Sequence, residues 1–310
     1  MFIKYLSKNL FIVISVLLSS ASATPTTFEQ SKIIAKEQIY FDRNDDGSTY
    51  CSCQWKWVGK SGGRVDFKSC GYKIRAEGQR NRAQRIEWEH IVPASNFGRA
   101  RQCWQKGGRS NCKQTDPVFN LMEADLHNLT PTVGELNSDR QNFNYGVLPS
   151  ATKRHGACEY RVDFKTRVVE PRNEIKGFLA RVYFYMHDRY GMNMSEQQQR
   201  LLMSWHNIYP VSAWELERDR RISTITGHSN PFVTGEKNWK IGQKSSAKVA
   251  ITANKAPVVQ KIIRGNRNSN VFHLPNGCPS YDKVSPKNIV EFVSETEAHD
   301  AGYKKAGNCN

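Results

Sequence analysis

Apolar residues recur at helical spacing in the second half of the chain. Residues 174–190 place Phe178, Val182, Tyr185 and Met186 on one side of a predicted helix. Two further apolar stretches follow Ser-Glu-Gln-Gln and Ser-Ala-Trp-Glu, sequences typical of helix N-caps. The pattern therefore predicts a helix after Ser195 and another after Ser212, the latter ending near Gly227. Thr27-Phe28-Glu29-Gln30 predicts an earlier helix with Ile33, Ile34 and Ile39 on its inner face.

Strand-like runs lie mostly in the first half. We expect short strands at residues 54–57, 85–92 and 126–131, a helix at 133–143, and a strand at 158–169. Residues from about 48 to 120 are otherwise rich in cysteine and glycine, and we expect irregular structure there. We expect a mixed α+β fold for the first domain and a small α+β module at the C-terminal end.

Composition divides the chain into four parts. Lys4 and Lys8, an apolar stretch at 10–18 and the small residues ending at Ala23 predict a secretory signal over 1–23. The first domain is then 24–236. Residues 237–261 form a basic linker rich in Lys, Ser and Ala, and 262–310 form a small C-terminal module that recovers apolar residues.

The chain is strongly basic. Its formal charge is +16, and removal of Lys4 and Lys8 with the signal leaves +14. Such an excess attracts polyanions, chiefly nucleic acid but also acidic envelope glycans or lipids. Charge alone does not choose among them.

All eight cysteines lie beyond the signal, and an even number in an exported chain predicts disulfides. Zinc is the alternative, but no pair in the first domain has the two-residue gap of a zinc knuckle. Cys103 with Cys112 is the pairing we expect first, because Gly107-Gly108 lets the chain turn back between them.

A carboxylate stands directly beside a histidine in Glu89-His90, just before Pro93. Histidine titrates near neutrality and can take a proton from water, while a glutamate oxygen suits Mg²⁺. Neighbouring side chains on an ideal strand point to opposite faces. The two groups can therefore converge only if the strand bends or ends there, as Pro93 suggests.

Downstream residues strengthen this assignment. The run His127–Pro131 can pair with the first strand, and residues 134–140 can form the helix beneath. The order strand, long loop, strand, helix resembles the ββα-metal nuclease motif, in which the first strand carries the base and the helix supplies a metal ligand. A phosphodiester is the electrophile that we expect in so basic a protein.

The first domain resembles the bacterial endonuclease I family of exported, magnesium-dependent, nonspecific nucleases. The resemblance rests on stretches in order between about residues 30 and 234, among them YCSCQWKW, RIEWEHIVPASNFGRARQCW, GGRSNC, DPVFNLMEADLHNLTPTVGELNSDRQNF and ARVYFYMHDRY. One position departs from the pattern: Leu216 stands where some members have a cysteine within WECERD, which puts one disulfide of such relatives in doubt.

The resemblance implies His90 as general base, Glu89 and Asn137 as metal ligands, and Arg109 as a phosphate contact. Asn128 competes for the second ligand role, but it lies in the strand and is expected to tie down the hairpin. The implied cofactor is Mg²⁺, with Mn²⁺ or Ca²⁺ as substitutes. The implied reaction hydrolyses DNA, and also RNA, to 5′-phosphate products without sequence specificity, by a monomer in the periplasm or outside the cell.

The C-terminal module looks similar to the Ada-type metal-binding domain, which uses four cysteines on zinc. This chain has only Cys278 and Cys309, with His273 nearby, so a disulfide is the expectation and a metal site the alternative. A helix capped by Ser294 and ending at Gly302 is expected there.

Two other functions fit part of these observations. A catalytically silent DNA-binding or DNA-uptake protein would share the basic charge and the disulfides, but it would not require Glu89, His90 and Asn137 together. An envelope-glycan binder would share the charge alone.

Overall fold

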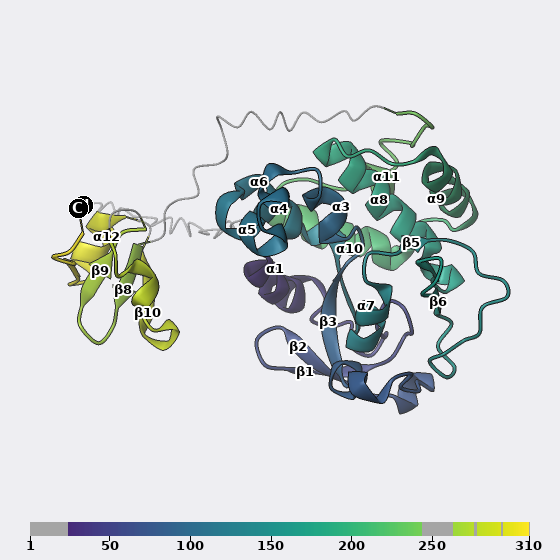
Figure 1. Cartoon of the computed structure of the whole chain (residues 1–310), viewed down its shortest axis with the longest axis horizontal. Helices are drawn as coiled ribbons and strands as arrows, with labels where there is room; N and C mark the ends of the chain where they lie inside the picture. The colour runs from purple at the N-terminus through teal and green to yellow at the C-terminus, as the bar shows by residue number, and fades with distance from the viewer. Residues whose placement is uncertain (1–23, 244–262, 276–277, 293, 310) are drawn as a thin grey trace, which may run out of the picture.

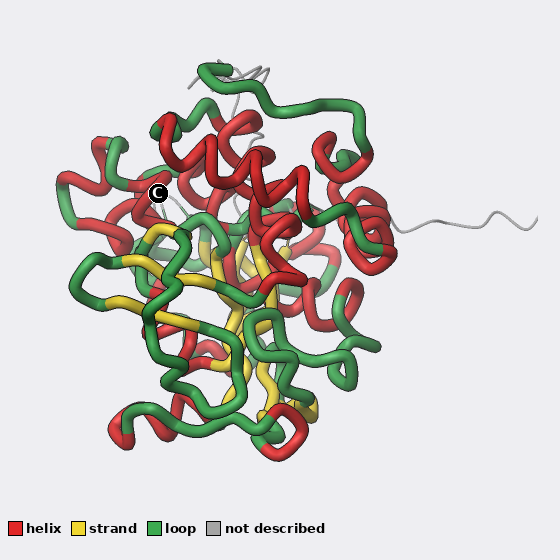
Figure 2. Tube along the Cα trace, turned by 90° about the vertical axis from the view of Figure 1, so that its right-hand side faces the viewer, coloured by secondary structure: helices red, strands yellow, loops and turns green. Residues whose placement is uncertain are grey.

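The computed structural model describes residues 24–243, 263–275, 278–292 and 294–309, so the signal and most of the linker lie outside the described residues. Helices and strands are mixed, which confirms the α+β class (Figure 1). In the view of Figure 2, helices gather towards the top, whereas strands and loops fill most of the lower half. Among the described residues, no helix has the length and apolar character needed to span a membrane.

The central element is an antiparallel four-stranded sheet in the order β1-β2-β3-β4. Its register sets Glu89 opposite Thr130 and His90 opposite Leu129, and the next element after β4 is helix α7. The predicted strand–strand–helix order is therefore present. The bounds are β1 (Trp55–Val58), β2 (Gly62–Val65), β3 (Arg85–His90), β4 (Leu129–Val133) and α7 (Gly134–Arg140).

The connection between β3 and β4 is helical, so the expectation of irregular structure up to residue 120 was wrong there. Asp116 caps one of these helices by accepting a hydrogen bond from the backbone nitrogen of Phe119 at 3.0 Å, and Pro117 follows it. The helices are α3 (Ala94–Gly98), α4 (Gln102–Gln105), α5 (Gly108–Thr115) and α6 (Pro117–Glu123), which lie together in Figure 1.

The four capping predictions are confirmed. The side chains of Thr27, Ser195, Ser212 and Ser294 each accept a hydrogen bond from the backbone nitrogen three residues on. Gly227 ends its helix in the left-handed conformation, with φ of +75°. The helices are α1 (Phe28–Ile34, continued by a π-helical segment η1, Ala35–Ile39), α8 (Lys176–Tyr190), α9 (Glu196–Ile208), α10 (Ala213–Thr226), α11 (Pro231–Thr234) and α12 (Glu295–Asp300).

Several other boundaries differ from prediction for local reasons. The carboxylate of Asp125 accepts from the backbone nitrogen of His127 at 2.9 Å, so residues 126–128 form a 3₁₀ turn before the strand begins. Asp163 binds the backbone nitrogen of Lys165 at 2.9 Å and breaks the predicted strand 158–169 into a hairpin. The resulting three-stranded sheet contains β5 (Asn144–Tyr145), β6 (Arg161–Asp163) and β7 (Val168–Glu170).

Two cores hold the first domain together. The larger joins the sheet to α7, α8 and α9, and the smaller joins η1 to Trp88, Leu129 and α10. Helix α8 is buried on nearly every side rather than along one stripe. Of the predicted inner face at α1 and η1, Ile39 is fully buried and Ile34 packs partly into the smaller core.

All eight cysteines are paired, as predicted, and the expected Cys103–Cys112 bridge is among them. The other bridges are Cys51–Cys158, Cys53–Cys70 and Cys278–Cys309. Leu216 is exposed, and the pairing is complete without a cysteine at that position.

The C-terminal module has its own small core around Phe272 and Phe292. Its sheet has the order β10-β8-β9-β11. The strands are β8 (Ile263–Asn266), β9 (Val271–His273), β10 (Ile289–Phe292) and β11 (Lys304–Lys305), with 3₁₀ turns at Tyr281–Lys283 and Pro286–Asn288.

Candidate active site

One cavity receives all four residues that the sequence singled out. Glu89, His90, Arg109 and Asn137 line a depression of about 500 Å³. Strand β3 ends at His90, which satisfies the condition that the neighbouring side chains of Glu89 and His90 reach the same space. Four segments distant in sequence meet here, because β3, α5 and α7 contribute these residues and α1 adds another wall.

The imidazole of His90 is held in one tautomer. Its Nε2 lies 2.8 Å from the backbone oxygen of Glu123, and a carbonyl oxygen only accepts hydrogen bonds. Nε2 therefore carries the proton, and Nδ1 keeps its lone pair. Burial, together with the positive charge of Arg109, lowers the pKa of His90 to about 3. The ring is thus neutral at physiological pH and able to take up a proton at Nδ1.

Helix α1 covers this ring. The Phe28 ring centroid lies 4.6 Å from that of His90, and the Ser31 hydroxyl donates to the backbone oxygen of Ala124 at 2.6 Å. Phe28 and Lys32 both line the cavity. Sequence reasoning placed α1 correctly but assigned it no part in the site, because nothing in the local pattern indicates which distant element a helix covers.

Glu89 presents a buried carboxylate. The Tyr50 hydroxyl donates to its Oε1 at 3.1 Å, and Nε of Arg140 lies 3.5 Å from the same oxygen. Burial raises the pKa of Glu89 to about 7, although Arg140 and Tyr50 oppose the rise. A bound cation would offset this desolvation, because it stabilises the ionised form.

Asn137 completes a hard-oxygen donor set. Its Nδ2 donates to Oε2 of Glu87 at 3.0 Å, an orientation assigned from the hydrogen-bond network. The Oδ1 atom is then the amide oxygen available to the cavity. A carboxylate and an amide oxygen are ligands that Mg²⁺ and Ca²⁺ accept, so the residues present fit a hard divalent cation.

Asn128 binds the backbone of a neighbouring segment and has a structural role. Its Oδ1 accepts from the backbone nitrogen of Val92 at 2.7 Å, and its Nδ2 donates to the backbone oxygen of Val92 at 3.0 Å. Asn128 lies in the 3₁₀ turn just before β4 rather than in the strand itself, and both ends of its amide tie this turn to the segment after β3. The interpretation of Asn128 as the residue that ties down the hairpin is confirmed.

Arg109 lies on α5, which the Cys103–Cys112 bridge ties to α4. Its Nε donates to Oε1 of Glu123 at 2.5 Å, and the side chain is 44% exposed. Nζ of Lys113 reaches the same carboxylate at 3.6 Å. Glu123 thus binds His90 through its backbone and Arg109 through its side chain, which couples the positions of the two groups.

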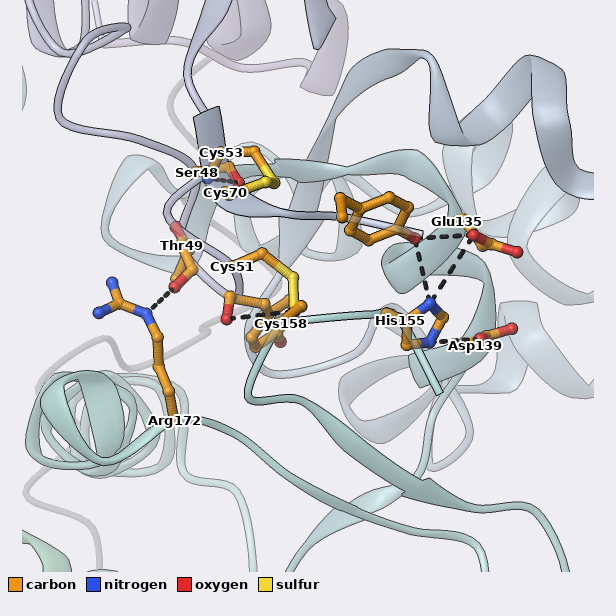
Figure 3. Close-up of a disulfide and its surroundings, with 12 residues drawn as sticks. Ser48, Thr49, Cys51, Cys53, Cys70, Glu135, Asp139, His155, Cys158 and Arg172 are labelled. Carbon is orange, nitrogen blue, oxygen red and sulfur yellow. Dashed lines mark hydrogen bonds and ion pairs between the residues drawn. A yellow bond between two sulfur atoms is a disulfide. The ribbon is translucent and has the colours of Figure 1, made fainter. Parts of the chain in front are cut away.

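Helix α7 is anchored on the side away from the cavity. The carboxylate of Glu135 accepts from the Tyr72 hydroxyl at 2.7 Å, and the carboxylate of Asp139 lies 3.1 Å from Nε2 of His155 (Figure 3). The Cys51–Cys158 bridge lies next to this group in the same view. These buried contacts fix the helix that carries Asn137. His155 is fully buried among these contacts, which gives it a structural role.

The cysteines of the C-terminal module are oxidised. Ligand atoms of His273, Cys278 and Cys309 lie within 4.8 Å of one another, and the two sulfurs form a disulfide. The expected bridge is therefore present. A disulfide sulfur is not a thiolate, so this state of the module provides no zinc-binding sulfur.

Comparisons with known proteins identify the family of the first domain. A family model described as Endonuclease I matches residues 27–236. Endonuclease-1 of Buchnera aphidicola subsp. Acyrthosiphon pisum is 45% identical over 210 residues, covering 68% of this chain and 81% of that protein. A periplasmic deoxyribonuclease of Aeromonas hydrophila is 41% identical over 229 residues, covering 74% and 93%. An extracellular deoxyribonuclease of the same species is 46% identical over 185 residues, covering 59% and 80%.

The similarity includes the segments that build the cavity. Phe28, Glu89, Arg109 and Asn137 all lie within the matched residues, whereas the C-terminal module lies beyond them. The two Aeromonas hydrophila relatives are named as periplasmic and extracellular enzymes, in agreement with the signal expected at residues 1–23. Because the match covers more than half of the chain, this protein belongs to the Endonuclease I family and is an exported nuclease.

Proposed function

We propose that this chain is a Mg²⁺-dependent endonuclease that hydrolyses phosphodiester bonds of DNA and RNA without sequence specificity and leaves 5′-phosphates. The observation that carries the proposal is the fixed tautomer of His90, which leaves a lone pair on Nδ1. His90 lines the same cavity as Glu89 and Asn137. A hydrolase needs a base, a cation and a charge-stabilising group close together, and these residues can supply them.

His90 acts as general base in this proposal. Nδ1 takes a proton from a water molecule in line with the scissile P–O bond, while the backbone of Glu123 keeps the ring in place. The substrate itself would make His90 more basic, because a phosphate in the cavity offsets the positive charge of Arg109.

Glu89 and Asn137 would hold the cation. When bound, Mg²⁺ supplies positive charge next to the phosphate and the leaving 3′-oxygen. Mn²⁺ and Ca²⁺ have the same preference for oxygen ligands and are expected to bind at this position. Arg109 shares the charge that develops on phosphate, because a guanidinium can donate two parallel hydrogen bonds to it.

The substrate class follows from charge and from the surroundings of the cavity. Lys32, Arg82, Arg85 and Arg109 line it, and these groups recognise the phosphodiester backbone rather than base edges. Backbone recognition explains activity without sequence preference. The names of the deoxyribonuclease relatives support DNA as a substrate. We expect RNA to be cut as well and the enzyme to act as a monomer.

The test is cleavage of DNA and RNA side by side, with Mg²⁺ or with EDTA, for the wild type and for His90→Ala. The proposal expects metal-dependent cleavage of both substrates by the wild type, loss in EDTA, and 5′-phosphates on the fragments. Cleavage that persists unchanged in EDTA would overturn the metal requirement. DNA binding without any cleavage would favour a silent DNA-binding protein instead.

A further inference from the structure

A second glutamate stands on the same face of β3 as Glu89. Glu87 precedes Glu89 by two residues, and residues two apart on a strand point to the same side. The side chain of Glu87 is 16% exposed and lines the same cavity. It is not among the residues that the sequence assigned to the chemistry.

The two carboxylate oxygens of Glu87 have different partners. Oε1 accepts from Nε of Arg82 at 2.9 Å and from Nε and Nη2 of Arg85 at 2.9 and 2.7 Å. Oε2 accepts from Nδ2 of Asn137 at 3.0 Å and also contacts Nη2 of Arg82. Two ion pairs keep the carboxylate charged, so both oxygens act only as acceptors.

This arrangement decides which end of the Asn137 amide faces the cavity. A carboxylate oxygen can bind the NH₂ end of an amide but not its carbonyl end, so Oδ1 must point elsewhere. An amide turned the other way would face the cavity with Nδ2, which cannot bind a cation.

The fold brings helix α7 unusually close to Glu87. A Cβ atom on Gly134, the first residue of α7, would lie 2.8 Å from Cδ of Glu87 and 2.5 Å from the backbone oxygen of Arg82. Only a residue without a side chain permits this approach. The glycine therefore allows the short contact between Glu87 and the helix that carries Asn137.

We infer that Glu87 is a positioning residue: it fixes the Asn137 amide so that Oδ1 faces the cation. The inference rests on the proposed function, because it assumes that Asn137 is a ligand. In the rival explanation, Glu87 only anchors Arg82 and Arg85 or attracts the cation by its charge.

Glu87→Gln separates these explanations because it preserves the shape of the side chain. Three arginine N–H groups converge on the Oε1 position, so the remaining carbonyl oxygen of the variant is expected there. The NH₂ group of the introduced glutamine would then face Asn137. The Asn137 amide would have to rotate so that its oxygen faces this NH₂ group. Residues that orient metal ligands typically change metal affinity by about 10- to 100-fold, and we expect a loss of this size.

The experiment is a double-mutant cycle with Glu87→Gln, Asn137→Ala and their combination in the full-length protein. The readout is Mg²⁺ or Mn²⁺ affinity by titration calorimetry without DNA, and circular dichroism verifies folding. Glu87→Gln should weaken binding by about tenfold or more in the wild type. In the Asn137→Ala background it should change binding by no more than roughly twofold.

A matched control removes a partner of Glu87 without touching Asn137. Arg85→Ala should not weaken cation binding. Gly134→Ala keeps Glu87 and Asn137 but forces them apart, and should reproduce the loss seen with Glu87→Gln, which supplies a second test if Glu87→Gln does not fold.

Two results overturn the inference and can be told apart. An equal loss for Glu87→Gln with and without Asn137 would show that Glu87 acts by its charge alone. If Asn137→Ala leaves cation affinity unchanged while Glu89→Ala abolishes it, the ligand assignment itself fails, and the inference about Glu87 fails with it.

Discussion

His90 at the end of β3 and Glu123 at the end of α6 are 33 positions apart in the chain and are joined by one hydrogen bond of 2.8 Å from Nε2 to a backbone oxygen. The bond makes the helical connection between β3 and β4 part of the candidate active site. It fixes the tautomer of the ring, because a carbonyl oxygen only accepts hydrogen bonds. The same glutamate binds Arg109 through its carboxylate.

Replacement of His90 by alanine should slow DNA cleavage by about 10²–10⁴-fold, because the general base is lost. The measurement is single-turnover cleavage of a labelled duplex at saturating Mg²⁺. Duplex binding, followed by fluorescence anisotropy with Ca²⁺, should stay close to that of the wild type. Near-normal turnover by this variant would remove His90 from the role.

Arg109 and Lys113 allow a matched comparison, because both pair with Glu123 but only Arg109 is among the residues described as lining the cavity. Arg109→Ala should lower kcat by about 10²-fold, the typical effect of removing one donor to a developing charge. The kcat of Arg109→Lys should lie between those of the wild type and Arg109→Ala, since an ammonium cannot bind phosphate bidentately. Lys113→Ala should have a much smaller effect. Equal losses for the two alanine variants would contradict this assignment.

Reduction should inactivate the enzyme, and the Cys51–Cys158 bridge should account for most of the effect. It closes a loop with a sequence separation of 107, and such bridges stabilise by up to about 5 kcal/mol. Exchange of Cys51 and Cys158 for serine should therefore lower Tm and abolish activity at 37 °C. The matched exchange of Cys278 and Cys309 should leave cleavage intact. Full activity of the wild type after exhaustive reduction would refute the prediction.

Buried neutral histidines should make the protein sensitive to acid. Burial lowers the pKa of His127 to about 3 and that of His187 to about 4, whereas an unfolded histidine titrates near 6.5. Below about pH 6.5 the unfolded chain binds protons that the folded chain does not, so stability falls as pH falls. Each histidine lowers the free energy of unfolding by up to about 1.4 kcal/mol per pH unit, until the pH reaches the pKa of that histidine in the folded state.

The measurement is Tm between pH 7 and pH 4. His187→Gln should flatten the curve, because the introduced amide can still donate to the backbone oxygen of Met192, which accepts from Nδ1 of His187 at 3.0 Å. A slope identical to that of the wild type would show that His187 does not contribute.

Binding of DNA should weaken steeply with salt, because cations on the protein displace counterions from phosphate. Lys32 lines the cavity, so Lys32→Ala should reduce the slope of log K against log salt by about one unit. Affinity measured from 50 to 300 mM NaCl provides the slope. An unchanged slope would place Lys32 outside the DNA contact.

Much of the local structure was predictable because its causes are local. Ser195, Ser212 and Ser294 begin helices through hydrogen bonds to residues three positions away, and the eight cysteines predicted an oxidised protein. The Asp116-Pro117 helix start is a local signal too, although it stands among glycines and cysteines that favour irregular structure.

The candidate site was predictable only in part. Glu89, His90, Arg109 and Asn137 were chosen from motifs, and the structure places them around one cavity. Phe28 and Glu87 were not chosen. A local pattern cannot reveal that α1 lies on the His90 ring. The two-residue spacing places Glu87 on the same face of the strand as Glu89, but it does not show that Glu87 binds Asn137.

The sequence alone determined the order of the main elements and the helix starts, because these depend on neighbours within a few positions. Its motifs also proposed the side chains of the candidate site. Tertiary structure decided the state of the candidate site residues: the tautomer of His90, the buried state of Glu89 and the orientation of the Asn137 amide. Each depends on a contact with a residue far away in the chain, and only chain folding brings such partners together.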